Sequence, residues 1–532
     1  MKNDHRLSLL FAAALLISGC TDHGNGGSGG GGGTFTITTT AAPFGVVGSN
    51  YSTTMATAGG TAPFTWMLFG GSLPAGLNLT NTATGAVTGT PTPPAGNSTA
   101  TFTVRDSTGK TATGSVLFAV HSRTDRVSVN NIGTPGNGAS TAPSISGDGS
   151  LVAFVSQATN LVTGVSSAQS QIYVHNRQTN QVEVVSRNST VSVIQGDGIS
   201  SAPAISTDGR FVAFVSQSTN LVPGVSGGQH VYLRDRQTGQ TSLVSRATNG
   251  GISNGTVNSV PSISSNGQFI AFVSNATNLV SGVIGQQQIY LRDTIAGTTT
   301  LISKSNDPIP GNGPSDGPSI SSDGQFIAFS SLASNLTTVI GSNQQIFIHD
   351  RLSGPNGTTT LVSRDSGGAS GNGNSGSPSV SGDGRFIAFW SLATNLLFGP
   401  TGQQIYLHDR NTGVNGTNSL VSPNFNVPTV GGNGASSDPS ISLNGRVVTF
   451  VSLSTDLLAG ISGQQVYSRE LATGTTNLVS RDNNLALIPG SGVSTSPSAS
   501  SDGSFVAFSS QSNNLVPVPP VAPSDIYVRA LP

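Results

Sequence analysis

The 532-residue sequence is poor in charge, cysteine and aromatic residues. Only 8% of its residues are charged, and 22 basic and 23 acidic side chains leave a net charge of −1. Such a chain produces no field that attracts a phosphate backbone or an acidic lipid, and its two Trp offer little stacking surface, so we expect no nucleic-acid partner. The single cysteine, Cys20, excludes a disulfide within the chain.

The sequence also lacks a long helical period outside its N-terminus. Instead, short apolar or β-branched runs alternate with Gly, Asn, Asp and Pro, which are the residues that set turns. A chain of this length is too long to fold around one core. We therefore expect an all-β protein with more than one domain.

The N-terminus has the pattern of a targeting segment. Lys2 and Arg6 precede an apolar run from Leu7 to Ile17 that is too short to span a bilayer, and the run leads into Ser18-Gly19-Cys20. This segment resembles a bacterial lipoprotein signal with its lipobox. The resemblance implies a signal peptide over residues 1–19, cleavage before Cys20, and lipid on the new N-terminal cysteine. An idle thiol behind an ordinary signal is the alternative.

Thr21 rather than Asp follows the cysteine, which by the sorting rule of enteric bacteria implies the outer membrane. Residues 20–33 are then the lipidated cysteine and a Gly-rich tether with an r.m.s. span of about 15 to 20 Å. We expect a cell-envelope protein held on the membrane through lipid on Cys20, at the outer rather than the inner membrane. Both the periplasmic and the surface side stay open.

Residues 34–121 carry short alternating strands with many Thr. Three motifs are distinctive: Gly60-Thr61-Ala62-Pro63-Phe64, Leu73-Pro74-Ala75-Gly76-Leu77 and Gly85-Ala86-Val87-Thr88-Gly89-Thr90-Pro91. They resemble the Ig-like domains of bacterial surface proteins. Their Pro and Gly also suit turns, and their Leu and Val suit a core. The resemblance implies a β-sandwich that serves as a spacer, which we prefer, or as an adhesive module.

From residue 123 onward the sequence is a repeat. Pro-Ser-Ile-Ser, Asp-Gly and Ala-Phe recur, with small variations, in seven copies 57 to 61 residues apart, which begin at Pro143, Pro203, Pro261, Pro318, Pro378, Pro439 and Pro497. Each full copy holds four short strand-like runs, and the second run is apolar on both faces, as stacking between propeller blades requires. Residues 123–530 are therefore predicted to form a seven-bladed β-propeller.

The last copy is one strand short. It ends after its third run, Ile526 to Arg529, whereas Arg126-Val127-Ser128-Val129 ahead of the first copy matches Leu361-Val362-Ser363-Arg364 inside the repeat. We therefore predict that the N-terminal strand closes the seventh blade. A closed ring leaves no end blade with an unpaired apolar face.

The repeat is similar to the TolB-like and WD-like repeats of periplasmic proteins. It reads Ser-Ile-Ser-x-Asp-Gly-x-Phe-x-Ala-Phe-x-Ser with a later Ile-Tyr-x-Arg-Asp. The resemblance implies a protein-binding or structural ring without chemistry of its own. We expect a monomer, no cofactor and no metal.

Two repeated sets of polar residues could suggest catalysis. The Asp-Gly pairs could form a ring of carboxylates, but two copies carry Asn266 and Asn444 instead, which favours a turn. His175, His349 and His408 fall where other copies carry Arg, and one repeat position is spread around a ring, so they cannot converge on a metal. We expect these basic side chains to make exposed pairs with the neighbouring Asp.

Paired glutamines follow the loop after the second strand of several copies. Their amides could hydrogen-bond a neutral glycan or a peptide backbone, on the face that they share with the Asn-Gly loops. The candidate ligand-face residues are Gln287, Gln288, Gln344, Gln345, Gln403, Gln404, Gln464 and Gln465.

Three functional hypotheses follow. The first is a non-enzymatic, lipid-anchored envelope protein whose propeller binds an envelope protein or a neutral glycan. The second is a hydrolase or lyase that acts on glycan or peptide in the propeller channel, which requires convergent ionisable residues on the inner strands. The inner strands read as Ser-Ile-Ser and its variants, which argues against it. The third is purely structural surface display.

Overall fold

The computed structural model describes residues 34–531 except 93–94, 166–168, 190–194, 226, 258, 284, 339–340 and 484–487. Every regular element within these ranges is a β-strand, which confirms the predicted all-β class. No helix that could cross a membrane occurs in this part of the chain. The predicted signal peptide, Cys20 and the tether lie outside the described residues.

The first domain, which we call the stalk, consists of two main sheets and a short strand pair. One sheet has the order β2-β9-β8-β5, another the order β3-β7-β6, and β1 pairs with β4. The strands are β1 (Thr36–Ile37), β2 (Gly45–Val46), β3 (Tyr51–Thr54), β4 (Thr57–Ala58), β5 (Thr65–Gly71), β6 (Leu77–Asn81), β7 (Ala86–Gly89), β8 (Gly96–Arg105) and β9 (Thr111–His121). Both main sheets contribute to one core around Trp66, Val87 and Phe102.

Seven four-stranded antiparallel sheets follow the stalk in the described chain. We number them sheet 1 to sheet 7 in chain order and call their successive strands inner, second, third and outer. The strands of sheets 1 to 3 are β11 (Ser140–Ile145), β12 (Leu151–Ser156), β13 (Gln171–Asn176) and β14 (Gln181–Val184); β15 (Ser200–Ile205), β16 (Phe211–Ser216), β17 (His230–Asp235) and β18 (Gln240–Leu243); and β19 (Ser262–Ile263), β20 (Phe269–Ser274), β21 (Gln288–Asp293) and β22 (Thr298–Leu301).

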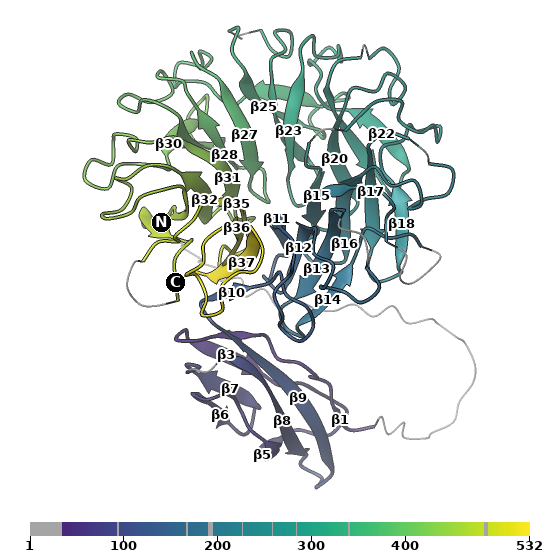
Figure 1. Cartoon of the computed structure of the whole chain (residues 1–532), viewed down its shortest axis with the longest axis vertical. Coiled ribbons are helices and arrows are strands. Elements are labelled where there is room, and N and C mark those ends of the chain that lie inside the picture. Colours follow the sequence, from purple (N-terminus) through teal and green to yellow (C-terminus); the bar gives the residue numbers. More distant parts are fainter. Residues whose placement is uncertain are drawn as a thin grey trace, which may run out of the picture.

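Sheets 4 to 7 repeat this plan. Their strands are β23 (Ser315–Ile320), β24 (Phe326–Ser331), β25 (Gln345–Asp350) and β26 (Thr358–Leu361); β27 (Ser375–Val380), β28 (Phe386–Ser391), β29 (Gln404–Asp409) and β30 (Thr417–Leu420); β31 (Ser436–Ile441), β32 (Val447–Ser452), β33 (Gln465–Glu470) and β34 (Thr475–Leu478); and β35 (Ser494–Ala499), β36 (Phe505–Ser510) and β37 (Asp525–Ala530). In Figure 1 the sheets follow one another around the molecule from blue through green to yellow, with the stalk below.

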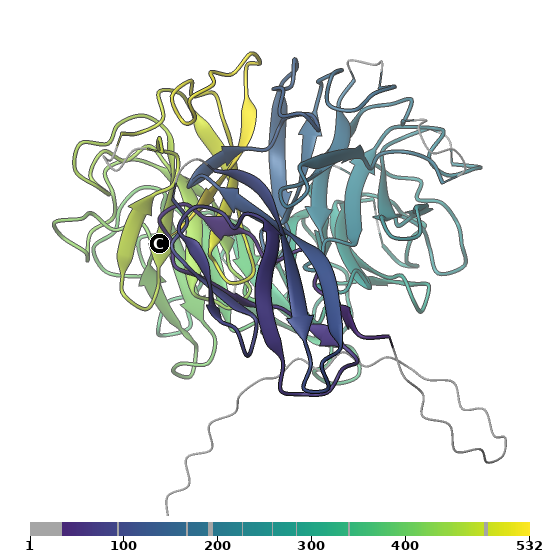
Figure 2. The same ribbon diagram turned by 90° about the horizontal axis from the view of Figure 1, so that it is seen from below.

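The last sheet is completed from the other end of the chain. β10 (Thr124–Arg126) pairs antiparallel with β37, so that Thr124 lies opposite Arg529. The predicted pairing of the N-terminal strand with the last strand is therefore present, and β11 also contacts β35 and β36. Figure 2 shows the yellow last strands beside the blue first ones, which is the seam of the ring.

A stacked aromatic pair forms the centre of every sheet. The second strand contributes Phe and the third strand Tyr or Phe, as in Phe272 and Tyr290, whose ring centroids are 5.8 Å apart. Both of these side chains are fully buried. The pairs are Phe154–Tyr173, Phe214–Tyr232, Phe272–Tyr290, Phe329–Phe347, Phe389–Tyr406, Phe450–Tyr467 and Phe508–Tyr527. The repeated apolar second strand thus exists because each sheet packs against a neighbour on both faces.

The first Ser of the Ser-Ile-Ser motif links neighbouring sheets. The Ser144 hydroxyl accepts a hydrogen bond from the backbone N–H of Ile205 in the next sheet at 3.1 Å. The same bond recurs from Ser262, Ser319, Ser379, Ser440 and Ser498 to the inner strand of the sheet that follows. Sheet 2 has Ala204 at this position and makes no such bond to Ile263 among the described residues.

We expect Ala204→Ser to stabilise the ring by about 0.5 to 1.5 kcal/mol, the usual net value of one hydrogen bond, because it adds the missing bond to the Ile263 N–H. Urea unfolding measures the change. Ser498→Ala removes the corresponding hydrogen bond from the Ile145 N–H and should lower the free energy of unfolding by a similar amount. A loss of stability in Ala204→Ser would contradict the role of this serine hydroxyl in joining neighbouring sheets.

The axis of the ring is constricted at the ends of the inner strands. Backbone hydrogen bonds connect the turns of successive sheets, including Gly147 to Thr207, Ser322 to Gly382 and Ser501 to Gly147. Residues from six of the seven sheets line a cavity of about 100 Å³ at this level, among them Ile145 and Ile320. The repeat therefore produces a narrow closure at one end of the axis, lined by both aliphatic and hydroxyl side chains.

Candidate functional site

The second glutamine of each predicted pair lies inside the ring. Gln288 is 1% exposed; its Oε1 accepts a 2.5 Å hydrogen bond from Ser303, and its Nε2 donates to the Gly311 carbonyl at 2.8 Å. Gln345, Gln404 and Gln465 make the same two bonds, and so does Gln171, which the sequence analysis did not select. The prediction that Gln288, Gln345, Gln404 and Gln465 face a ligand is corrected, because the amide of each fastens the third strand to the loop after the outer strand.

The first glutamine of each pair, at Gln287, Gln344, Gln403 and Gln464, is half-buried at the edge of the same loops. Its backbone carbonyl accepts a hydrogen bond from the first N–H of the next inner strand, as Gln287 does from Ser315. The side chain of Gln403 donates to the Ser436 carbonyl at 3.0 Å. A ligand-face role for these four residues stays a prediction.

The Asp-Gly pairs form turns. Asp148 accepts hydrogen bonds from the Ser146 hydroxyl and from the backbone N–H of Ser150, at 2.8 and 2.9 Å, and Gly149 has a φ of 72°. Asn266 accepts the same pair of bonds in sheet 3. Because an amide oxygen serves as well as a carboxylate, the turn interpretation is confirmed at these positions.

The repeated His and Arg position is buried. His349 Nδ1 lies 2.9 Å from the Thr359 hydroxyl of the outer strand, and Arg234 donates to Thr241 in the same way. The expectation of exposed pairs with the neighbouring Asp was wrong: Asp235 instead pairs with Arg210 at 2.6 Å. These side chains point across their own sheet and not into the axis.

His175 differs from its equivalents. The outer-strand residue opposite it is Val182, which offers no hydrogen bond, and His175 Nδ1 is buried without a partner among the described residues. Burial lowers the pKa of His175 to about 3, so the imidazole is neutral at neutral pH.

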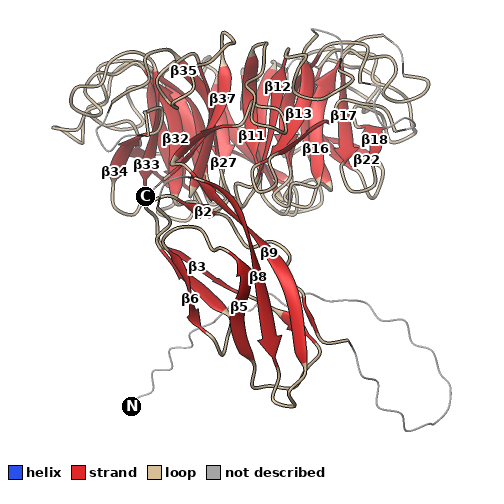
Figure 3. Ribbon diagram, turned by 60° about the horizontal axis from the view of Figure 1, so that its bottom comes forward, coloured by secondary structure: helices blue, strands red, loops and turns tan. Residues whose placement is uncertain are grey.

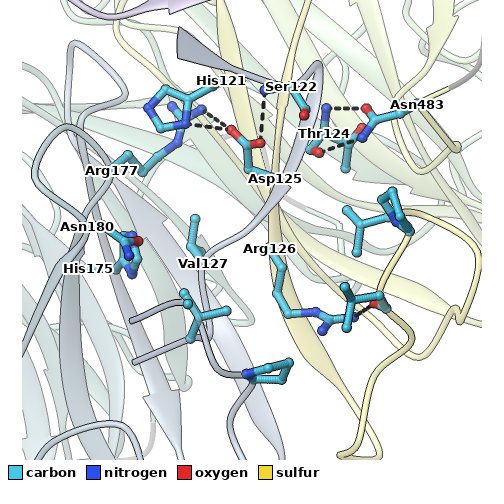
Figure 4. Close-up of a pocket in the computed structure, with 16 residues that line it drawn as sticks. His121, Ser122, Thr124, Asp125, Arg126, Val127, His175, Arg177, Asn180 and Asn483 are labelled. Carbon is cyan, nitrogen blue, oxygen red and sulfur yellow. Dashed lines mark hydrogen bonds and ion pairs between the residues drawn. The ribbon is translucent and has the colours of Figure 1, made fainter. Parts of the chain in front are cut away.

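His175 lines a cavity of about 360 Å³ at the seam of the ring. The cavity lies between β10, the end of β13 and the loop at Val516–Val518. Figure 4 shows Asp125 turned toward His121 and Arg177, with Thr124 held by Asn483. Asn483 accepts from the Thr124 N–H at 2.6 Å and donates to its carbonyl at 2.9 Å.

Asp125 connects three parts of the chain at this seam. Its Oδ2 lies 2.9 Å from His121 Nδ1 and 3.2 Å from Arg177 Nη2. Burial alone would raise the pKa of Asp125, but the hydrogen bond and charge of His121, together with Arg177, hold it below its usual value. Glu183 of sheet 1 and Arg236 of sheet 2 form the equivalent ion pair. The ion pair between Asp125 and Arg177 therefore joins sheet 7 to sheet 1 in the same way that sheet 1 is joined to sheet 2.

The stalk docks on this seam through Phe44. The Phe44 ring lies 5.0 Å from Phe505 and 5.1 Å from His121 between centroids, and the Arg177 guanidinium lies 4.7 Å above it. Gln178 adds a hydrogen bond to the Ala42 carbonyl at 2.8 Å. Arg177 and Phe505 belong to the end of the ring that carries the Asp-Gly turns, which we call the stalk-side face.

The glutamines lie on the opposite end, which we call the distal face. The third strand β13 runs from Gln171 on the distal face to Asn176 and Arg177 on the stalk-side face, and the other third strands repeat this direction. Figure 3 shows the stalk below the ring and the loops of the distal face above it. The distal face therefore points away from the stalk.

Phe44→Ala should loosen the junction and leave both domains folded. We expect docking to weaken by about 1 to 3 kcal/mol, because one aromatic contact pair and one cation–π contact are lost. Limited proteolysis between His121 and Thr124 should accelerate, and small-angle X-ray scattering should report a broader range of shapes. Phe35→Ala, which removes a ring that stacks on Phe64 within the stalk, is the control. An unchanged cleavage rate in Phe44→Ala would contradict the docking role.

The inner strands carry two carboxylates that the sequence analysis missed. They begin upstream of the repeated Pro, so β23 includes Asp316 and β31 includes Asp438. The description of the inner strands as free of ionisable residues was therefore wrong. Among the described residues, no group of three or more His, Cys, Asp or Glu is placed to hold a metal ion.

Comparison with protein families identifies the first domain. The family described as "Putative Ig domain" matches residues 33–121, which confirms the Ig-like domain predicted from its motifs. A search of curated proteins found no match to the chain.

Solved structures that resemble the chain are β-propellers. One described as a TolB of Agrobacterium tumefaciens is 18% identical, with a TM-score of 0.37, over 68% of this chain and 99% of that chain. An oligogalacturonate lyase of Vibrio parahaemolyticus is 13% identical, with a TM-score of 0.46, over 77% and 93%. A protein of unknown function from Bacteroides thetaiotaomicron is 9% identical, with a TM-score of 0.36, over 94% and 99%.

Proposed function

We propose that this chain is a non-enzymatic, lipid-anchored protein of the cell envelope that presents a seven-bladed β-propeller for binding. The Ig-like β-sandwich is its stalk, the seven sheets are its blades, and β10 closes the seventh. The partner is an envelope protein or a glycan, and the protein acts as a monomer. Lipid on Cys20 supplies the attachment, with the outer membrane as the expected location.

The orientation of the ring carries this proposal. The described chain enters at the end of the stalk farthest from the ring, where Ile37 packs beside Gly114, and it leaves at His121 beside Phe44 and Phe505. The stalk contacts the ring at Phe505 and Arg177, on the face where the axis is also constricted. The distal face is the one free to meet a partner.

Site-directed photocrosslinking in cells tests the proposal. A photoreactive residue at the exposed Leu392 of the distal face should capture a discrete partner from the wild-type anchored protein. The same residue at the exposed Gln237, on the stalk-side face, is the positional control. Cys20→Ser should move the protein out of the membrane fraction. Equal labelling from both faces, or none from either, would reject binding through the distal face.

A further inference from the structure

The charged residues of the stalk lie together at one end. Between residues 34 and 121 the sequence contains three Asp, Glu, Lys or Arg residues, which are Arg105, Asp106 and Lys110. They belong to the turn that joins β8 to β9. β9 is an eleven-residue strand of about 35 Å that ends at His121 beside the ring. The turn is therefore the end of the stalk farthest from the ring, and we call residues 105–111 the stalk tip.

The stalk tip exposes two cations and covers the carboxylate between them. Asp106 is 5% exposed. Its oxygens accept hydrogen bonds from the backbone N–H groups of Thr61, Thr108 and Lys110. Arg105 and Lys110 are exposed, and neither forms an ion pair with a residue that the structure describes. Although the whole chain has a net charge of −1, the stalk tip therefore presents positive charge.

Large apolar side chains are exposed on the strand beside the stalk tip. β5 lies at the edge of its sheet, and its Met67, Leu68 and Phe69 are 57%, 43% and 73% exposed. Thr65 of β5 lies opposite Arg105, so Met67 is about 7 Å along the strand from that pair. Because side chains two residues apart in a strand share a face, Met67 lies on the same side of the sheet as Arg105. Figure 1 shows β5 toward the end of the stalk away from the ring.

The chain enters the stalk at the same end. Ile37 of β1 lies against Gly114, near the start of β9. Residues 20–33, which the sequence predicts to be a tether, therefore lead to the stalk tip and not to the ring. A lipid on Cys20 would hold the stalk tip within about 15 to 20 Å of a bilayer surface.

We propose that the stalk docks on the bilayer surface, with the β5 residues Met67, Leu68 and Phe69 in the headgroup region and the cations of the stalk tip against lipid phosphates. This inference rests on the lipid-anchored function proposed above and names the surface against which the anchor holds the stalk. A flexible tether alone would leave the orientation of the ring free. Docking of the stalk would turn the distal face away from the bilayer.

The chemistry of this end of the stalk favours a bilayer over a second copy of the chain. Exposed apolar side chains suit the boundary between headgroups and acyl chains, and nearby Lys and Arg side chains suit the phosphates above it. A second stalk would bury the apolar residues but would offer the cations no free carboxylate, because Asp106 is the one acid of the domain and is already hydrogen-bonded. The predicted tether also places the bilayer within reach.

A fluorescent label near the stalk tip tests docking directly. Ala83 is exposed in the turn between β6 and β7, and the carbonyl of its neighbour Thr82 accepts a hydrogen bond from the Trp66 N–H of β5 at 2.7 Å. Full-length protein, as cells process it, is labelled with an environment-sensitive dye at Ala83→Cys and diluted from detergent into vesicles of phosphatidylethanolamine and phosphatidylglycerol. We expect the emission to shift to shorter wavelength and iodide quenching to fall.

Two controls accompany this label. Leu392→Cys on the distal face should keep its aqueous emission when vesicles are added. The unsubstituted protein, treated with the same dye, gives any signal from Cys20, which is the one cysteine of the natural chain.

Phe69→Ser tests the apolar contribution. It removes an exposed ring, so the stalk should still fold, and the label at Ala83 should return toward its aqueous emission. Phe398→Ser removes an exposed phenylalanine from the ring and is the matched control, which should respond like the unsubstituted background.

The double variant Arg105→Gln/Lys110→Gln tests the charge contribution. It should lower the ratio of docked to free stalk by about 5-fold for each cation removed, the effect of one Lys or Arg near an anionic surface. The loss should disappear on vesicles of phosphatidylcholine alone, and high salt should weaken docking of the unsubstituted stalk on anionic vesicles.

Three results would overturn the inference. They are a label at Ala83 that stays aqueous with vesicles, an unchanged response in Phe69→Ser, and a dimer in detergent that Phe69→Ser abolishes while vesicles have no effect. The last result would assign the surface to a second copy of the chain. Flotation of the vesicles tests the anchor separately. Protein that floats while its label stays aqueous keeps the lipid anchor and rejects docking, and protein that does neither rejects both.

Discussion

Phe272→Ala should lower the unfolding free energy of the ring by about 3 to 5 kcal/mol, the usual cost of truncating a buried phenylalanine. Phe272 has no exposed surface, it stacks on Tyr290, and it packs within a cluster shared by sheets 2 and 3. The cavity left behind would open on the face where the two sheets meet, so both would lose contacts.

Urea unfolding followed by tryptophan emission measures this loss. Trp390 lies in the ring and Trp66 lies in the stalk, so the emission follows the unfolding of both domains. Phe398→Ala is the control, because Phe398 is fully exposed and its removal should change stability by less than about 0.5 kcal/mol. A loss below about 1 kcal/mol in Phe272→Ala would show that its burial contributes little.

Arg126→Met should cost about 3 to 5 kcal/mol at neutral pH, because it leaves a buried carboxylate without its cation. Arg126 Nε lies 3.1 Å from Asp525 Oδ2, and the side chains are 5% and 0% exposed. Asp525 occupies the position that holds Gln in five other sheets, and its Oδ1 still accepts from the equivalent serine, Ser128, at 2.7 Å. Arg126 therefore compensates a charge that only sheet 7 carries here.

The pH dependence of the Arg126→Met variant has a definite sign. Burial raises the pKa of Asp525, whereas Ser128 and Arg126 lower it. Removing Arg126 should raise the folded pKa further above the unfolded value of about 3.9. A raised folded pKa favours the folded state below the unfolded pKa, and that advantage is lost as the pH rises through the folded pKa. The variant should therefore be closer to wild type at pH 5 than at pH 8.

A rescue experiment separates charge from packing. Adding Asp525→Gln to Arg126→Met installs the side chain that sheets 1, 3, 4, 5 and 6 carry at this position. In those sheets the glutamine amide donates a hydrogen bond to a glycine carbonyl, and Gly136 is the equivalent glycine in sheet 7. The double variant should recover most of the lost stability. If it unfolds like the single variant, the loss comes from the contacts of Arg126 with Val518 and Tyr527 and not from the charge.

The sequence predicted those features that depend on local pattern. Four strand-like runs per repeat, the Asp-Gly turns and the strand before the first repeat all follow from alternation and spacing, and each is present. A period repeated seven times is a strong signal, because each copy must satisfy the same neighbours.

The candidate site was less predictable, because the contacts of its residues lie outside the local sequence pattern. Gln288 follows a loop in the sequence, which suggested an exposed side chain. Its amide is buried because it hydrogen-bonds to Ser303 and Gly311, which follow the outer strand of the same sheet. Asp438 lies outside the repeated motif, at a left-handed position before Pro439 that strand alternation does not predict. A comparison of the copies, position by position, would have revealed Trp390 and Asp438 as the members that break the repeat.

The seam has a consequence for biosynthesis. Thr124 and Arg529, which meet there, are 405 positions apart in the chain, so the first strand of the ring stays without its partner until nearly all of the remaining chain has been made. During that interval the edges of the ring are open to other chains. A polypeptide that terminates early would keep those edges exposed, which makes the same junction a marker by which proteases and chaperones can tell incomplete chains from finished ones.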